Sequence, residues 1–250
     1  MIQVRELCKT FYDSKRGHHA AVDQVSFEVH AGEVFGLLGP NGAGKTTTLR
    51  LLATLLKPTS GTAILNGCDV NQSPAKVRQQ IGFLSGEMGL YARLTPREIL
   101  EFFGRLNGMD GQHCARRISE LLTVFDMNDF AGVRTDKLST GMKQKTAIAR
   151  TMLHDPPILI LDEPSSGLDV PTARTIESAI MAAKKSGKCI IYSTHVMEEA
   201  EYLCDRIGVI DHGRLKIMGT MDQLRQATGK QRLREIFLEL LGLPQDHREA

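Results

Sequence analysis

Long hydrophobic runs are missing from this chain of 250 residues. The longest apolar stretches, 158–161 and 189–192, are far shorter than the ~20 residues that a helix needs to cross a bilayer. Charges at Arg5 and Glu6 precede any apolar segment, so the beginning of the chain does not resemble a signal peptide. We therefore expect a protein with no membrane-spanning part of its own.

Paired cysteines and a strong excess of one charge are also lacking. The five cysteines are widely spaced and form no CxxC pair, which argues against a zinc site and predicts reduced thiols in the cytosol. The formal net charge is only +2, whereas nucleic-acid-binding domains usually carry a marked basic excess. We expect no nucleic-acid partner.

Short β-branched runs alternate with amphipathic stretches along most of the chain, which is typical of an α/β fold with a mainly parallel sheet. We predict a first pair of strands that is antiparallel, and a helix at 45–56 that ends before Pro58. The expected strands are 4–8, 25–29, 33–38, 62–65, 158–161, 189–193 and 207–210, with a hairpin turn at 212–213 leading into 215–218.

The middle of the chain reads as helix only. Residues 95–98, Thr-Pro-Arg-Glu, form a capping box with proline at the first helical position, and apolar residues then recur at helical spacing. We predict one domain over 1–250 that has three parts. They are an α/β core with an antiparallel β part at 1–94 and 133–220, a helical subdomain at 95–132, which continues into the next helix, and a C-terminal helical extension at 221–250, whose apolar stripe packs on the core.

A glycine-rich segment, residues 39–46, matches the pattern G-x-x-x-x-G-K-[ST]. An apolar strand precedes it and a helical run follows, so its backbone N–H groups can surround phosphate oxygens at a helix N-terminus. Lys45 would reach the β- and γ-phosphates, and the Thr46 hydroxyl would bind Mg²⁺. The residues expected to contact the nucleotide here are Gly39, Pro40, Asn41, Gly42, Ala43, Gly44, Lys45, Thr46 and Thr47.

Two adjacent acids, Asp162 and Glu163, follow a run of four apolar residues. Such a run predicts a buried strand, and open α/β sheets bind ligands where their strands end. Asp162 suits the coordination shell of Mg²⁺, directly or through water. Glu163 would polarise the attacking water as a general base. Because neighbouring strand residues point to opposite sides, we expect the two acids to have separate roles.

Further segments resemble the ATP-binding subunits of ABC transporters. Residues 138–142, Leu-Ser-Thr-Gly-Met, resemble the signature motif of that family, and 166–169 resemble its D-loop. His195 ends an expected strand as the family's switch histidine does. Phe11, with Tyr12 as second choice, stands where the family stacks an aromatic ring on adenine. The resemblance covers residues 2–220 and includes the order and spacing of these motifs.

This resemblance implies an ATPase that uses ATP and Mg²⁺ and works as a head-to-tail dimer with two sandwiched ATP molecules. Ser139 and Gly141 of one chain would contact the nucleotide held by the other, and Asp169 would lie at the same interface. Glu163, His195 and Lys45 would be the catalytic residues. A separate transmembrane permease subunit is the implied partner, at the cytoplasmic face of the membrane.

The chain departs from the family pattern at three positions. Gly86 stands where the family has a glutamine that touches Mg²⁺, so Glu87 or water would have to substitute for it. Thr140 and Met142 replace a glycine and a glutamine of the signature. Together with residues 85–91 and 138–145, these features resemble the sodium-efflux (NatA-like) subfamily, which implies an exporter.

Two other function classes are weighed against this interpretation. The first is a soluble ABC protein that acts on ribosomes or DNA. Ribosome-associated relatives carry two such domains, and DNA-repair relatives insert a long coiled coil, whereas this chain has one domain and no sustained heptads. The second is a regulator that binds ATP without turnover. The complete set of catalytic residue types disfavours it.

Overall fold

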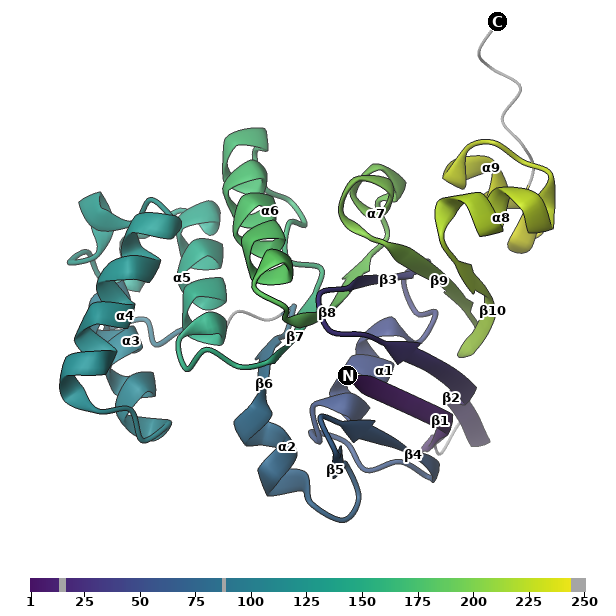
Figure 1. Cartoon of the computed structure of the whole chain (residues 1–250), viewed down its shortest axis with the longest axis horizontal. Helices are drawn as coiled ribbons and strands as arrows, with labels where there is room; N and C mark the ends of the chain where they lie inside the picture. Colours follow the sequence, from purple (N-terminus) through teal and green to yellow (C-terminus); the bar gives the residue numbers. More distant parts are fainter. Residues whose placement is uncertain (14–16, 87–88, 244–250) are drawn as a thin grey trace, which may run out of the picture.

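A computed structural model describes residues 1–13, 17–86 and 89–243 (Figure 1). Its core is a six-stranded sheet in the order β10-β9-β3-β8-β7-β6. All neighbouring pairs are parallel except β9 and β10. The strands are β3 (Val34–Leu38), β6 (Ile81–Leu84), β7 (Ile158–Asp162), β8 (Cys189–Thr194), β9 (Arg206–Asp211) and β10 (Arg214–Gly219). The turn between β9 and β10 lies at His212 and Gly213, both with positive φ, as the sequence predicted.

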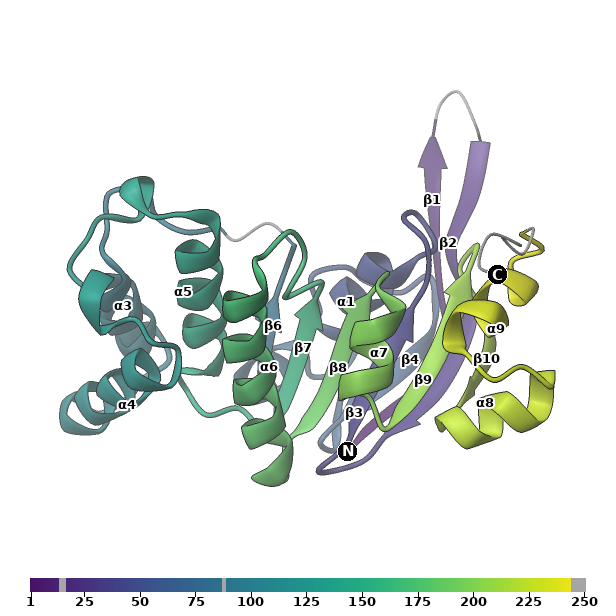
Figure 2. The ribbon, with the colours of Figure 1, turned by 90° about the horizontal axis from the view of Figure 1, so that it is seen from above.

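A second, antiparallel sheet has the order β2-β1-β4-β5. It consists of β1 (Ile2–Asp13), β2 (Gly17–Val29), β4 (Ser60–Leu65) and β5 (Cys68–Asp69). The first two strands are longer than predicted and project as a hairpin beyond the rest of the molecule (Figure 2). Register shifts interrupt their pairing between Val4 and Thr10, and such irregularities hide a long strand from a pattern search.

Helices cover both faces of the core sheet. The helix α1 (Lys45–Leu52) lies between the two sheets, where Leu49 and Leu52 are fully buried. On the opposite face α5 (Thr140–Met152) and α6 (Val170–Lys185) pack in one apolar cluster with β7 and β8, and α7 (Met197–Leu203) lies beside them (Figure 2). The arrangement confirms the predicted fold class.

The helical middle of the chain forms one end of the molecule (Figure 1). It contains α3 (Pro96–Leu106), α4 (Gly111–Val124) and two short 3₁₀ turns, η1 (Asn128–Phe130) and η2 (Thr135–Lys137). The predicted capping box is present: the Glu98 amide donates to Thr95 Oγ1 at 3.2 Å, and the Thr95 amide donates to Glu98 Oε2 at 2.8 Å. The domain limits proposed from the sequence stay a prediction.

One predicted helix is shorter than expected, and one helix was not predicted. The first helix ends at Leu52 and not at 56, because Thr54 adopts φ 59° and the Leu55 amide turns back to the Arg50 carbonyl at 2.9 Å. The sequence pattern also gave no position for α2 (Pro74–Gln80), since a helix of seven residues with one buried side chain has almost no periodic signal.

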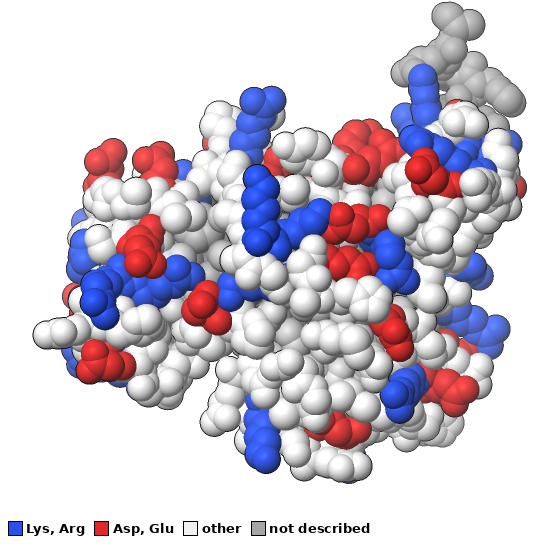
Figure 3. Space-filling model, viewed as in Figure 1, with Lys and Arg blue, Asp and Glu red and all other residues white. Residues whose placement is uncertain are grey.

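The last helices are α8 (Met221–Thr228) and α9 (Leu233–Leu240). Leu224, Leu233 and Ile236 are fully buried in a cluster with β9 and α7, which confirms that the apolar stripe packs on the core. Across the described residues no helix is long and apolar enough to span a membrane. Acidic and basic side chains alternate over the face seen in Figure 3.

Candidate nucleotide-binding site

The glycine-rich loop connects β3 to α1 at the end of a strand whose five residues are all buried. Gly44 caps the helix with φ 107°, and a Cβ there would lie 2.5 Å from the Ala21 carbonyl oxygen. Only glycine tolerates both the positive φ and the close approach. Gly42, at φ 82°, turns the loop in the same way. The glycines therefore fix the loop against the antiparallel sheet at the N-terminus of α1.

Lys45 is 4% exposed and wraps its side chain over this loop. Its ammonium group donates to the Gly39 carbonyl at 2.7 Å and to the Pro40 carbonyl at 3.2 Å. It also lies 3.4 Å from Glu163 Oε1. The positive charge is thus held at the end of the core sheet, between the loop after β3 and the acid that follows β7, two strands away in the sheet.

Asp162 and Glu163 have different surroundings. Asp162 is the last residue of β7, is 2% exposed, and accepts a hydrogen bond from Ser193 Oγ at 2.6 Å. Glu163 follows it with φ 48°, and its amide donates to both the carbonyl and the hydroxyl of Ser193, at 3.1 and 3.2 Å. A left-handed non-glycine residue carries strain that surrounding contacts must hold. Ser193 provides those contacts.

His195 lies directly after β8. Its Nδ1 is 3.2 Å from Glu163 Oε1, the same oxygen that faces Lys45. Lys45 and His195, which are far apart in the sequence, therefore approach the same oxygen of Glu163 at the C-terminal ends of parallel strands. This is the edge at which open α/β sheets bind their ligands.

A pocket of about 250 Å³ opens at this point. It is lined by Pro40, Asn41, Gly42, Gly44, Lys45, Thr46, Thr47 and Glu163 of the predicted set, and by His19 and Ala21 of β2. Sequence reasoning missed His19, because only the pairing of β1 with β2 brings it here. A cavity lined by backbone amides, one lysine and hydroxyls suits a chain of phosphates.

The aromatic side chain that is expected to stack on adenine lies in the projecting hairpin. Phe11 pairs with His19 across the two strands, and Tyr12 pairs with His18. Directly opposed residues share a face of the sheet, so Phe11, which is 39% exposed, lies on the face of the pocket residue His19. Tyr12 lies on the other face. The register thus favours Phe11 over Tyr12 for stacking on a base.

The remaining predicted residues form a second group. The Ser139 hydroxyl caps α5 by accepting from the Met142 amide at 3.2 Å. Asp169 caps α6 by accepting from the Thr172 amide at 2.8 Å, and hydrogen bonds from Thr172 lower the pKa of its carboxyl. A Cβ on Gly141 would lie 3.1 Å from Thr172 Oγ1. The first turn of α5 thus approaches the first turn of α6, and both helices begin with a capping side chain.

One residue of the type expected for Mg²⁺, Thr46, lines the pocket, and the other, Asp162, directly precedes the lining residue Glu163. The Thr46 hydroxyl and the Asp162 carboxylate supply oxygen, which Mg²⁺ prefers, and this ion commonly completes its shell with water and substrate phosphates. The described residues hold no cluster of three or more His, Cys, Asp or Glu that would bind a metal alone. Gly86 offers no ligand, and Glu87 lies outside the described residues.

The chain is similar to known proteins along most of its length. Residues 22–166 match the family model described as ABC transporter. The ATP-binding protein NatA of Bacillus subtilis is 40% identical over 96% of this chain and 98% of its own length. A probable multidrug ATP-binding protein, YbhF of Escherichia coli, is 42% identical over 90% of this chain, which spans 38% of that longer protein.

Solved structures agree. An ATP-binding subunit of an ABC transporter superposes with a TM-score of 0.88 at 31% identity, covering 96% of this chain and 99% of the other. The ATP-binding cassette MJ0796, solved as a dimer in a post-hydrolysis state with ADP and Pi, gives a TM-score of 0.81 at 27% identity over 88% of this chain and 98% of that one. The chain therefore belongs to the ABC transporter family as an ATP-binding subunit, with NatA among its similar relatives.

Proposed function

We propose that this protein hydrolyses Mg-ATP and thereby drives export through a separate membrane permease, with sodium as the first substrate to test. The observation that carries the proposal is the meeting of Lys45 Nζ and His195 Nδ1 at Glu163 Oε1, 3.4 and 3.2 Å away, beside the phosphate-sized pocket. The sodium assignment is supported by the likeness to NatA, whereas the export assignment is also supported by relatives such as a Nod factor export ATP-binding protein.

In the proposed reaction the residues of this chain mainly position groups and stabilise charge. Lys45 and the loop amides would hold the β- and γ-phosphates. Glu163 would accept a hydrogen bond from the attacking water and orient it, and His195 would donate to the γ-phosphate. Thr46 and Asp162 would hold Mg²⁺, which would supply charge neutralisation for the phosphate oxygens.

The working form proposed here is a head-to-tail dimer. Ser139 and Gly141 stand at the N-terminus of α5, where the helix dipole favours an anion. In a head-to-tail pair this end of one chain would face the phosphate loop of the other, and Asp169 would lie at the same contact. The dimeric state of the relative MJ0796 supports this arrangement.

Substitution of Glu163 by glutamine tests the catalytic part. Because the amide keeps the shape of the side chain but is a poor base, we expect ATP binding close to wild type and turnover reduced by about a hundredfold or more. Binding is measured with a fluorescent ATP analogue and turnover by phosphate release. Glu198→Gln is a matched control, since Glu198 is exposed and lines a different pocket from Glu163. Undiminished turnover in Glu163→Gln would remove Glu163 from this role.

An exposed aromatic patch supports the membrane-partner part. We define it as Tyr91, Phe102 and Leu106, which are 51, 46 and 69% exposed. The rings of Tyr91 and Phe102 meet edge to face with centroids 5.8 Å apart. Apolar groups gathered at a surface often mark a contact with a partner. Phe102 and Leu106 belong to the predicted helical subdomain at 95–132, and Tyr91 lies on the segment that leads into it.

Affinity purification from gently solubilised native membranes tests the partner. We expect a stoichiometric multi-helix membrane protein with the wild-type chain and its loss with Phe102→Ser/Leu106→Ser, whose own ATP binding should persist. Sodium efflux in cells with both chains then tests the substrate. Recovery of ribosomal or DNA-bound proteins without a membrane protein would favour the soluble alternative.

A further inference from the structure

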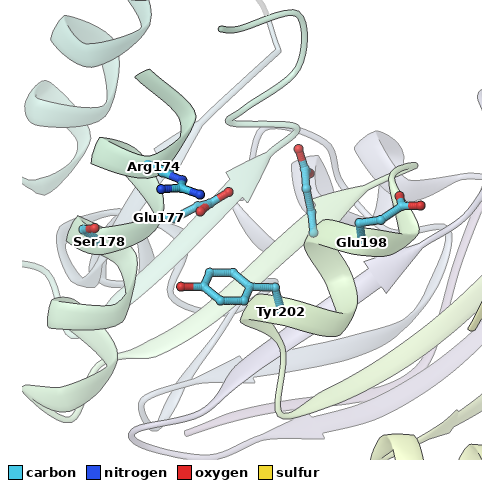
Figure 4. A pocket seen from close by; sticks show the side chains of 6 residues that line it. Arg174, Glu177, Ser178, Glu198 and Tyr202 are labelled. Carbon is cyan, nitrogen blue, oxygen red and sulfur yellow. The ribbon is translucent and has the colours of Figure 1, made fainter. Parts of the chain in front are cut away.

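The side chain of Glu199 contacts none of the residues assigned to ATP so far, yet it lies at the junction of the two segments that carry Glu163 and His195. It projects from α7, and its carboxylate is only partly exposed. One edge borders a pocket of about 520 Å³ between α6 and α7. Arg174 and Glu177 of α6 face Tyr202 of α7 across this pocket (Figure 4).

Three hydroxyl groups surround this carboxylate. Ser165 Oγ donates to Oε1 at 2.8 Å, Thr194 Oγ1 donates to Oε2 at 2.7 Å, and the Tyr192 hydroxyl donates to Oε2 at 3.0 Å. The Ser165 and Tyr192 hydroxyls are themselves 2.6 Å apart. All three partners are at most 6% exposed. Hydrogen bonds to an ionised acceptor are stronger than neutral ones, so this cluster is a rigid junction.

Two of these hydrogen-bond partners adjoin the predicted catalytic residues in the sequence. Ser165 stands two residues after Glu163, and Thr194 immediately precedes His195. The Thr194 hydroxyl also accepts from the Val196 amide at 3.0 Å, which fixes the backbone on both sides of His195. One carboxylate on α7 therefore ties the segment after β7 to the segment after β8.

We propose that Glu199 is a positioning residue that sets the geometry between Glu163 and His195 through Ser165 and Thr194. The proposal rests on the proposed ATPase function. It explains why a charged group stands behind the site, where it cannot reach the pocket of the phosphate loop. Burial and the neighbouring Glu199 raise the pKa of Tyr192, so the tyrosine stays a hydrogen-bond donor in the cluster.

The first test is Glu199→Gln, because glutamine keeps the shape but has one acceptor oxygen where the carboxylate has two. A misalignment of reacting groups by a fraction of an ångström to one ångström can reduce a rate by up to about a hundredfold. We expect kcat for ATP hydrolysis to fall about ten- to fiftyfold, with KM for ATP within about threefold of wild type. Glu198→Gln, on the same helix and lining the same pocket, should match wild type.

A double substitution separates positioning from general damage. Thr194→Val removes the hydroxyl that links Glu199 to His195, so it should reduce kcat on its own, and Thr194→Ser should restore most of the loss. In the Thr194→Val background, Glu199→Gln should add at most about a twofold loss, since coupled residues are non-additive. Thermal unfolding is measured for each variant.

Each outcome decides the question. A kcat of Glu199→Gln equal to that of Glu198→Gln overturns the proposal, and so do fully additive losses or a loss confined to KM. If Glu199→Gln does not fold, Thr194→Val, Thr194→Ser and Ser165→Ala decide it alone, and equal kcat values for Thr194→Val and Thr194→Ser overturn it. The proposed ATPase function is tested separately: it holds if the wild-type protein hydrolyses ATP and Glu163→Gln does not. Failure of the Glu199 proposal can therefore be told apart from failure of the proposed function.

Discussion

The predicted site residues fall into two groups that differ in their contacts within the chain. In the phosphate-loop group, Lys45 Nζ and His195 Nδ1 both lie within 3.4 Å of Glu163 Oε1. In the signature group, Ser139 and Asp169 cap their own helices. The first group is joined by ion pairs inside one chain, whereas the polar side chains of the second group bond to the first turns of their own helices.

A single chain can therefore preorganise only part of the site. Lys45, Glu163 and His195 follow the ends of parallel strands, and the buried core fixes the positions of these strands. A helix N-terminus needs an anion or a capping side chain to satisfy its amides, and Ser139 supplies only part of that. The head-to-tail dimer proposed above would join the two groups, so the most informative experiments act on one group at a time.

The largest effect is expected from removing the charge of the first group. Lys45→Ala should lower ATP affinity and reduce turnover by about a hundredfold or more, because the ammonium is the cation held over the loop and is expected to stabilise transferring phosphate. Equilibrium binding and phosphate release measure the two effects. Lys76→Ala, an exposed lysine on α2, is the matched control. Normal turnover in Lys45→Ala would contradict the assignment of the loop.

The second prediction concerns Gly141→Asp, which disrupts the signature group, and the recovery of turnover when this variant is mixed with another. Gly141→Asp places a negative charge at the N-terminus of α5, where the helix dipole tolerates it, but where it would repel the ATP of the other chain. Alone, this variant should lose at least about tenfold in turnover while its own loop still binds ATP. Circular dichroism checks its fold, because the new Cβ approaches Thr172.

Mixing Gly141→Asp with Lys45→Ala sharpens the comparison. In a head-to-tail heterodimer one site combines both defects, and the other site is wild type on both sides. Random pairing at equal amounts should therefore restore up to about a quarter of wild-type turnover. Turnover equal to the mean of the two separate variants would show that the two groups do not meet across a dimer.

How far the sequence could predict this site depends on the range of the interactions. The glycine loop and the Thr95 capping box are local patterns, and both stand where the sequence placed them. Ser193 could not be found in this way. It acts because β7 and β8 pair Asp162 with Ser193, and that register is set by the whole sheet. His19 and Glu199 escaped prediction for the same reason.

Ser193 provides the third prediction. This fully buried hydroxyl donates to Asp162 and accepts from the Glu163 amide. Ser193→Ala should lower turnover about five- to tenfold and cost about 1–2 kcal/mol of unfolding free energy, because a buried carboxylate loses its hydrogen bond. Urea denaturation and steady-state kinetics measure both. Ser178→Ala removes an exposed hydroxyl from α6 and should change neither. Equal behaviour of the two variants would show that Ser193 does not hold the acids.

The smallest effect is expected at Gly86, which lies after β6 on the connection from the core sheet to the helices bearing the aromatic patch. A side chain fits there, since a Cβ on Gly86 would meet no atom of the described residues within 4 Å. Gly86→Gln adds an amide oxygen, a ligand type that hard cations accept. We expect the Mg²⁺ concentration for half-maximal hydrolysis to fall about two- to threefold.

A titration of Mg²⁺ at fixed ATP measures this shift, and a parallel titration of ATP-analogue binding separates ion retention from turnover. Gly111→Gln is the control, because it introduces the same side chain at an equally open position on α4. If both variants leave the Mg²⁺ dependence unchanged, glycine at position 86 does not weaken ion retention. The Mg²⁺ shell would then rest on Thr46 and Asp162, with water and phosphate, and would not depend on the side chain at position 86.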